Sequence, residues 1–203
     1  MKLNAAIKPN KEMLEQLVKV ISSNRFLNKQ GLGNEVPFFI CPFQPEDANQ
    51  VARLRQQLTS RLEKKGVQIL EIDLYDLSME ILIKRNVWNR VIELEHSISK
   101  DQLKEFLQGI LAPEEHLVPA IASKITNEEF DVLFLTGVGE VFPYIRSHNV
   151  LNNLQSTAKN QPTVVFFPGS YTHVPDSGTS LELFGKLRDD KYYRAFNIFQ
   201  FEV

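Results

Sequence analysis

A turn that contains Thr136, Gly137 and Gly139 is the part of the sequence best suited to binding an anion. It follows an apolar run and precedes a helical pattern, and glycines at such a junction expose amide hydrogens at the positive end of the helix dipole. Arg146, about two turns later, could add a guanidinium. The same turn is also an ordinary strand-to-helix connection, and Glu140 would repel an anion. Both interpretations stay open.

The motifs of common catalytic and metal sites do not occur in the sequence. The glycine turn lacks both the lysine of a P-loop and the third glycine of a dinucleotide fingerprint. The chain contains no G-x-S-x-G elbow, and its four histidines are scattered without an H-x-x-x-H pair or a cysteine partner. Cys41, the single cysteine, ends an apolar run and is best explained as a buried thiol. We therefore expect no catalytic residues, no metal and no cofactor.

A segment near the C-terminus combines arginine with tyrosine, the residue types that are enriched in interface hot spots. Its members are Arg188, Tyr192, Tyr193 and Arg194. One interpretation is a surface that binds another protein. The other is that Arg188 forms ordinary solvated ion pairs with neighbouring aspartates, while one tyrosine of the pair packs inward.

A second cationic segment, Lys84, Arg85 and Arg90 around Trp88, could contact nucleic acid, although an indole beside a charged helix face usually packs into the core. The formal net charge of −2 and the pI near 6.1 give no overall attraction to nucleic acid. Residues 1–100 carry 15 Lys and Arg against 12 Asp and Glu, a net of +3, and residues 101–203 carry 8 against 13, a net of −5. Any basic footprint must therefore be local.

Hydrophobic patterning predicts an α/β fold with a mostly parallel sheet of about five strands and flanking helices. Short apolar runs predict buried strands at 36–41, 67–73, 130–135 and 163–167. Helical spacing lies at 10–21 and at 46–65, where Gly66 would end the helix. The connection between the first two strands is long enough to make them parallel.

The remaining segments complete a single predicted domain over residues 1–203. Residues 74–129 show only helical spacing, which predicts a helical insertion between the second and third strands. Further predictions are a helix from Val141 to Leu154, a loop from Pro168 to Ser180 and an edge strand within 192–201. A single cysteine, no signal peptide and no apolar run of membrane-spanning length predict a cytoplasmic protein.

Three motifs in the same order resemble the BrxB family, whose members are encoded in bacterial BREX (bacteriophage exclusion) loci. They are residues 136–148, residues 166–171, and Phe184-Gly185 together with residues 192–196. The resemblance implies a non-enzymatic role in phage resistance beside the ATPase BrxC, the phosphatase-like protein PglZ and a DNA methyltransferase. The family supplies no catalytic residues to carry over.

Together these observations predict an adaptor or scaffold that binds other BREX proteins, PglZ and BrxC among them, through Arg188 and residues 192–194. The alternative is a sensor of a nucleotide or phosphate ligand at Gly137 and Gly139. We expect neither nucleic acid nor a membrane as a direct partner. The oligomeric state stays open.

Overall fold

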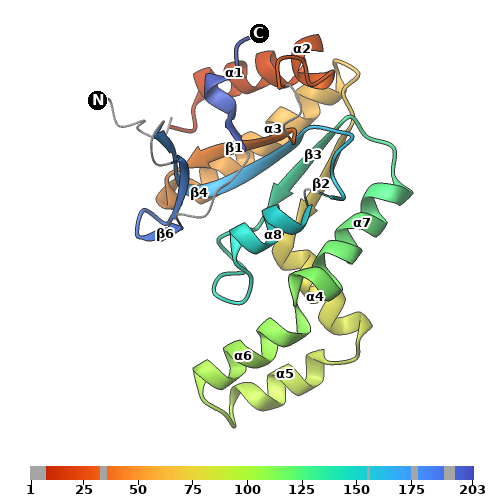
Figure 1. Ribbon diagram of the computed structural model, residues 1–203, viewed down its shortest axis with the longest axis vertical. Coiled ribbons are helices and arrows are strands. Elements are labelled where there is room, and N and C mark those ends of the chain that lie inside the picture. The colour runs from red at the N-terminus through yellow and green to blue at the C-terminus, as the bar shows by residue number, and fades with distance from the viewer. Residues whose placement is uncertain (1–7, 33–35, 155, 175–177, 190–194) are drawn as a thin grey trace.

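The fold is a parallel sheet with helices on both faces, as the sequence predicts (Figure 1). The computed structural model describes residues 8–32, 36–154, 156–174, 178–189 and 195–203. The parallel strands lie in the order β2-β3-β4-β1-β7. Their bounds are Ile69–Asp73 (β2), Val132–Thr136 (β3), Thr163–Val174 (β4), Phe38–Phe43 (β1) and Phe196–Asn197 (β7).

Strand β1 shows why the sheet needs helices on both faces. All six of its residues are buried, and its alternate side chains enter two different hydrophobic cores. Phe39 and Cys41 pack with the N-terminal helices, whereas Phe38 and Ile40 pack with the helices that follow β2. This two-sided burial explains why the strand is apolar without alternation.

One face of the sheet is covered by α1 (Lys11–Ile21), α2 (Asn24–Leu27) and α3 (Ala48–Glu63), with a short 3-10 turn (Pro45–Asp47) before α3. The side chain of Asn10 caps α1 by accepting a hydrogen bond from the Met13 amide at 2.9 Å. Gly66, at φ +82°, follows α3 and allows the Val67 amide to donate to the Leu62 carbonyl. Both helix ends are therefore encoded locally, and the end at Gly66 is the predicted one.

The segment between β2 and β3 is helical, which confirms the predicted insertion. Its elements are α4 (Leu74–Lys84), α5 (Trp88–Glu95), α6 (Lys100–Ile110), a π-helical turn (Pro113–Leu117) and α7 (Val118–Asn127). The α5 and α6 pair extends away from the sheet (Figure 1), and each of these two helices has one buried residue, Val91 and Leu107.

The predicted helix from Val141 to Leu154 is wrong in its first half. Residues 138–145 form successive turns, and α8 spans only Ser147–Leu154. Pro143 has no amide hydrogen and disfavours helical backbone at the residue before it, so the helix begins after it. Val141 and Ile145 are nevertheless buried, because they pack into the core from the turns. Val141 and Ile145 are therefore buried four positions apart, as in a helix, although the residues between them form turns.

The predicted loop from Pro168 to Ser180 is also wrong. Strand β4 continues to Val174 and pairs antiparallel with β5 (Gly178–Leu183), which pairs with β6 (Leu187–Asp189). We call residues 169–174, β5 and β6 the β-arm. A side chain at Gly169 would place its Cβ 2.0 Å from the Glu182 carbonyl oxygen, so this glycine permits the two strands to pair. Tyr171 and Leu181 are paired across the arm and buried.

The predicted edge strand near the C-terminus is present but short. Strand β7 covers Phe196 and Asn197 and lies parallel to β1 at the edge of the sheet. A 3-10 turn follows at Ile198–Gln200, where the Asn197 side chain accepts a hydrogen bond from the Phe199 amide. The strand therefore ends where Asn197 caps the turn.

Candidate functional site

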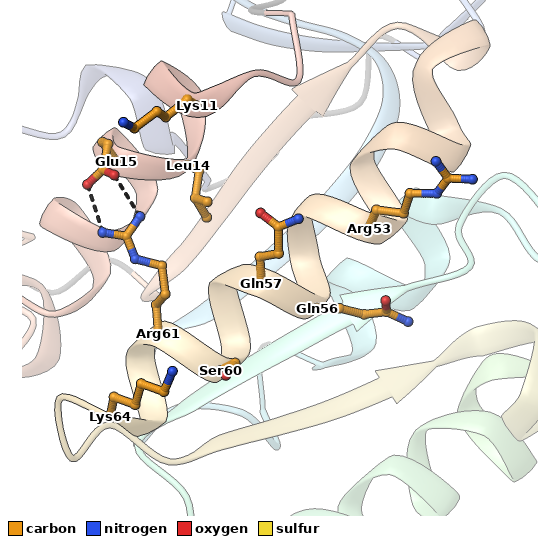
Figure 2. Close-up of a pocket in the computed structure, with 9 residues that line it drawn as sticks. All are labelled: Lys11, Leu14, Glu15, Arg53, Gln56, Gln57, Ser60, Arg61 and Lys64. Atoms are coloured by element: carbon orange, nitrogen blue, oxygen red, sulfur yellow. Dashed lines mark hydrogen bonds and ion pairs between the residues drawn. The ribbon is translucent and has the colours of Figure 1, made fainter.

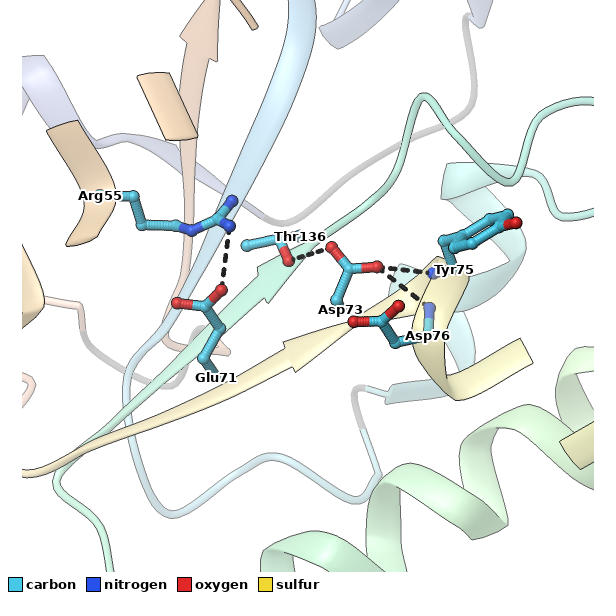
Figure 3. Close-up of polar contacts among 6 residues, drawn as sticks. All are labelled: Arg55, Glu71, Asp73, Tyr75, Asp76 and Thr136. Carbon is cyan, nitrogen blue, oxygen red and sulfur yellow. Dashed lines mark hydrogen bonds and ion pairs between the residues drawn. The ribbon is translucent and has the colours of Figure 1, made fainter. Parts of the chain in front are cut away.

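The carboxyl ends of β2 and β3 bring Asp73 and Thr136 together, because these two residues are in register (Figure 3). The Thr136 hydroxyl donates a 2.7 Å hydrogen bond to Asp73 Oδ2. The other oxygen, Oδ1, accepts from the amides of Tyr75 and Asp76 at 2.9 and 3.2 Å and so caps α4. Asp73 thus ties the two strand ends to the first helix of the insertion.

The two glycines of the predicted anion-binding turn have structural roles. Gly137 has φ +72°, and a Cβ there would lie 2.6 Å from Asp73 Oδ1. A Cβ on Gly139 would lie 2.8 Å from Pro168 Cγ and 2.9 Å from Phe184 Cε1. The glycines therefore allow the turn to approach the Asp73 carboxylate on one side and the base of the β-arm on the other.

Negative charge dominates this edge of the sheet. Arg55 forms a 3.0 Å salt bridge with Glu71 (Figure 3). Burial raises the pKa of Glu71, and the Asp73 carboxylate raises it further, whereas Arg55 opposes both. Burial also raises the pKa of Glu140, with added repulsion from Asp73 and Asp76. One arginine faces four carboxyl groups, which disfavours an anion at this turn.

Arg146 does not complete an anion site at the start of a helix that follows the turn, because α8 begins at Ser147 and not at Gly137. Its guanidinium carbon lies 5.8 Å from the centroid of the Phe142 ring, in a cation–π contact. Thr136 and Gly137 therefore lie beside Asp73, whereas Arg146 stacks on Phe142. The helix dipole on which the sequence-based argument depended is not at the turn.

Other candidate groups for chemistry have structural surroundings. Cys41 is fully buried, and burial raises the pKa of its thiol, which disfavours the reactive thiolate. Within the described ranges, no three His, Cys, Asp or Glu residues are grouped so as to hold a metal ion. Of the helices in the described part of the chain, none combines the length and the apolar character needed to cross a bilayer.

The cations around Trp88 hold the insertion together. Arg85 donates a 2.9 Å hydrogen bond to the Ile110 carbonyl, and the Arg90 guanidinium lies over the Phe106 ring at 5.6 Å. Trp88 itself is half-buried and packs against the core. These contacts join α4 and α5 to α6 and favour the structural interpretation of the segment.

The predicted partner surface begins on the β-arm. Arg188 is exposed on β6, which is an outer strand that pairs only with β5 among the described strands. The neighbouring Leu187 is 41% exposed. Tyr192, Tyr193 and Arg194 lie outside the described residues. The structure therefore locates the first of the four predicted residues on an exposed strand edge.

A groove between α1 and α3 is a feature that the sequence-based search missed (Figure 2). It has a volume of about 710 Å³, and we call it the α1–α3 groove. Its polar lining includes Lys11, Glu15, Arg53, Gln57, Arg61 and Lys64. The signal was present in the sequence, because the α3 members and the capping Lys64 recur at helical spacing beside the row of buried leucines.

Comparison with known proteins identifies the family. A family model described as BREX protein BrxB matches residues 70–198, more than half of the chain. BREX protein BrxB of Bacillus cereus (strain H3081.97) is 35% identical over 191 residues, which cover 92% of this chain and 96% of that protein. The chain belongs to the BrxB family. BREX protein BrxB of Escherichia coli O9:H4 (strain HS) is 29% identical over 91% of this chain and 89% of the relative.

Family membership makes the chain a component of a BREX phage-defence system. The names of the two BrxB relatives assign them to the system without naming a reaction. No solved structure matches the chain. The matched region begins within β2 and includes the insertion, the Asp73–Thr136 contact and the β-arm, whereas α1, β1, α3 and the α1–α3 groove precede it.

Proposed function

We propose that this BrxB-family chain is a non-catalytic adaptor that binds other BREX proteins. The observation that carries the proposal is the β-arm, which leaves the parallel sheet and ends in the exposed strand β6. Among the described strands β6 pairs only with β5, so it is an outer strand at which a partner strand can add, and Leu187 contributes exposed apolar surface there. Arg188 adds a guanidinium of the type that is common in interface hot spots.

The proposed contact surface comprises Arg188, Tyr192, Tyr193 and Arg194, and the proposed partners are the PglZ-type and BrxC-type proteins of the system. At the carboxyl edge of the sheet, where α/β proteins usually bind ligands, the Asp73 carboxylate caps a helix and accepts from Thr136. This use of the edge in holding the fold together supports a role in assembly over one in chemistry.

Co-purification tests the proposal directly. The tagged chain is isolated from cells that carry the complete BREX locus, and the bound proteins are identified by mass spectrometry. A variant with Arg188→Glu, Tyr192→Ala and Arg194→Glu should lose PglZ, since truncating one hot-spot residue costs about 2 kcal/mol or more and each 1.4 kcal/mol is about tenfold in affinity.

A charge-matched control separates a local contact from a general electrostatic effect. The variant Lys100→Glu with Lys159→Glu changes the net charge by the same amount at two exposed positions elsewhere. It should retain PglZ. If the variant with Arg188→Glu, Tyr192→Ala and Arg194→Glu is folded and still co-purifies PglZ as the original chain does, the proposed surface is wrong.

A further inference from the structure

We propose that the α1–α3 groove binds the phosphate backbone of duplex nucleic acid. The proposal concerns a surface distinct from the β-arm and does not depend on the adaptor role. It also revises the expectation, drawn from the overall charge, that nucleic acid is not a direct partner. The groove is a local basic surface of the kind that an acidic chain can still carry.

Charge is segregated into this groove. Its lining contains the cations Lys11, Arg53, Arg61 and Lys64 and one carboxylate, Glu15, which is a net charge of +3. The whole chain has a net charge of −2, so the remainder carries −5. A concentrated positive patch on an otherwise acidic molecule attracts a polyanion to one place and one orientation.

Most of the cationic side chains in the groove form no ion pair with another described residue. Arg61 donates two hydrogen bonds to the Glu15 carboxylate, at 2.7 and 2.9 Å (Figure 2). Lys11, Arg53 and Lys64 are exposed, and their side chains make no ion pair or hydrogen bond within the described part of the chain. The Arg61 hydrogen bond and charge, with the nearby lysines, lower the pKa of Glu15. The one carboxylate of the lining is therefore already neutralised.

The uncharged lining favours phosphate oxygens. Gln57 and Ser60 line the groove beside the cations, and Lys, Arg, Gln and Ser are the side chains that usually contact phosphate and sugar. Among the described residues that line it, none has an aromatic side chain on which an unpaired base could stack. The apolar side chain of its described lining, Leu14, is buried, so a protein partner would find no apolar anchor point there. A duplex backbone fits these features best.

The shape of the groove suits an extended ligand. Arg53 on α3 and Lys64, which caps the end of this helix, lie eleven positions apart, which is about 16 Å along the helix axis. A second hollow of about 490 Å³ shares Lys11 and Arg53 and continues the groove past Asn10. Because duplex DNA carries one charge per about 1.7 Å of its axis, several phosphates lie within reach of this stretch.

Fluorescence anisotropy with a labelled duplex of about 20 base pairs tests the proposal, since three unpaired cations predict a salt slope of about −2.7. Affinity should therefore fall about 40-fold between about 50 and 200 mM salt. The variant Arg53→Gln with Lys64→Gln leaves one unpaired cation and should reduce this fall to about 3- to 4-fold, with weaker binding at every salt concentration.

The matched control is Lys100→Gln with Lys159→Gln, which removes the same charge outside the groove. It should bind the duplex as the original chain does. The proposal is overturned if the original chain does not bind, if both variants lose binding equally, or if poly-glutamate of equal charge displaces the duplex as well as unlabelled duplex does. The last outcome would make the groove a site for acidic protein segments.

Discussion

Replacing Asp73 by alanine tests whether the carboxyl edge of the sheet is a structural joint. The change removes the cap of α4 and the acceptor of the Thr136 hydroxyl together. Loss of an N-cap costs about 1 kcal/mol. Thr136 is only 1% exposed, so its hydroxyl loses its partner away from water, at a further cost of about 1–3 kcal/mol.

The free energy of unfolding should therefore fall by about 3 kcal/mol, which for a chain of this size lowers the melting temperature by about 6–12 °C. Asp73→Asn keeps one oxygen to cap α4, while its amide group takes the place of the oxygen that accepts from Thr136 and can instead donate to the Thr136 hydroxyl, so it should cost less than Asp73→Ala. Urea denaturation followed by far-ultraviolet circular dichroism measures both variants.

A double-mutant cycle isolates the hydrogen bond between the two strands. Thr136→Val removes the hydroxyl, so adding this change to Asp73→Ala leaves no unpaired donor in the buried site. The two changes together should cost about 1–2 kcal/mol less than the sum of the separate changes. Additivity within about 0.5 kcal/mol would refute the structural account of the pair. If Asp73→Asn folds with full stability but abolishes phage resistance, the carboxylate performs chemistry and the non-catalytic proposal is wrong.

Three further variants test packing at two glycines and the electrostatics of Glu71. Gly139→Ala should lower the free energy of unfolding by about 1–3 kcal/mol in urea denaturation, because its Cβ would meet Pro168 and Phe184. Gly109→Ala in α6 meets nothing within 4 Å and should raise it by about 0.5–1 kcal/mol; equal effects of the two glycine variants would contradict this reasoning. The pKa of Glu71 is raised in the fold, so the original chain loses stability as pH rises from about 4.5 through the raised value. Glu71→Gln cannot titrate and so does not lose stability in this way. Its free energy of unfolding, minus that of the original chain, should therefore increase over that pH interval. A difference that stays constant would contradict the predicted direction.

Much of the sheet and its helices could be predicted because the signals are local. Strand β1 is apolar at every position, and a run of that kind predicts burial on both faces. Asn10 and Gly66 mark helix ends through contacts within a few residues of themselves. The same local rules gave wrong predictions around Pro143 and Gly169. The residues around Pro143 are buried because they pack against distant segments, and not because they form a helix. The residues after Gly169 form a strand because they pair with β5.

The sequence by itself determined the α/β class, the helical insertion and the family, since periodicity, caps and motifs are all contained in short stretches of chain. Only the tertiary structure decided what surrounds the Gly137 turn, because Asp73, which is 63 residues from Thr136 in the chain, lies beside the turn and joins the ends of two strands. The α1–α3 groove likewise exists only where two helices pack side by side. The local charge of a surface depends on which segments of the chain pack next to each other. The folding of distant segments onto each other determines this packing.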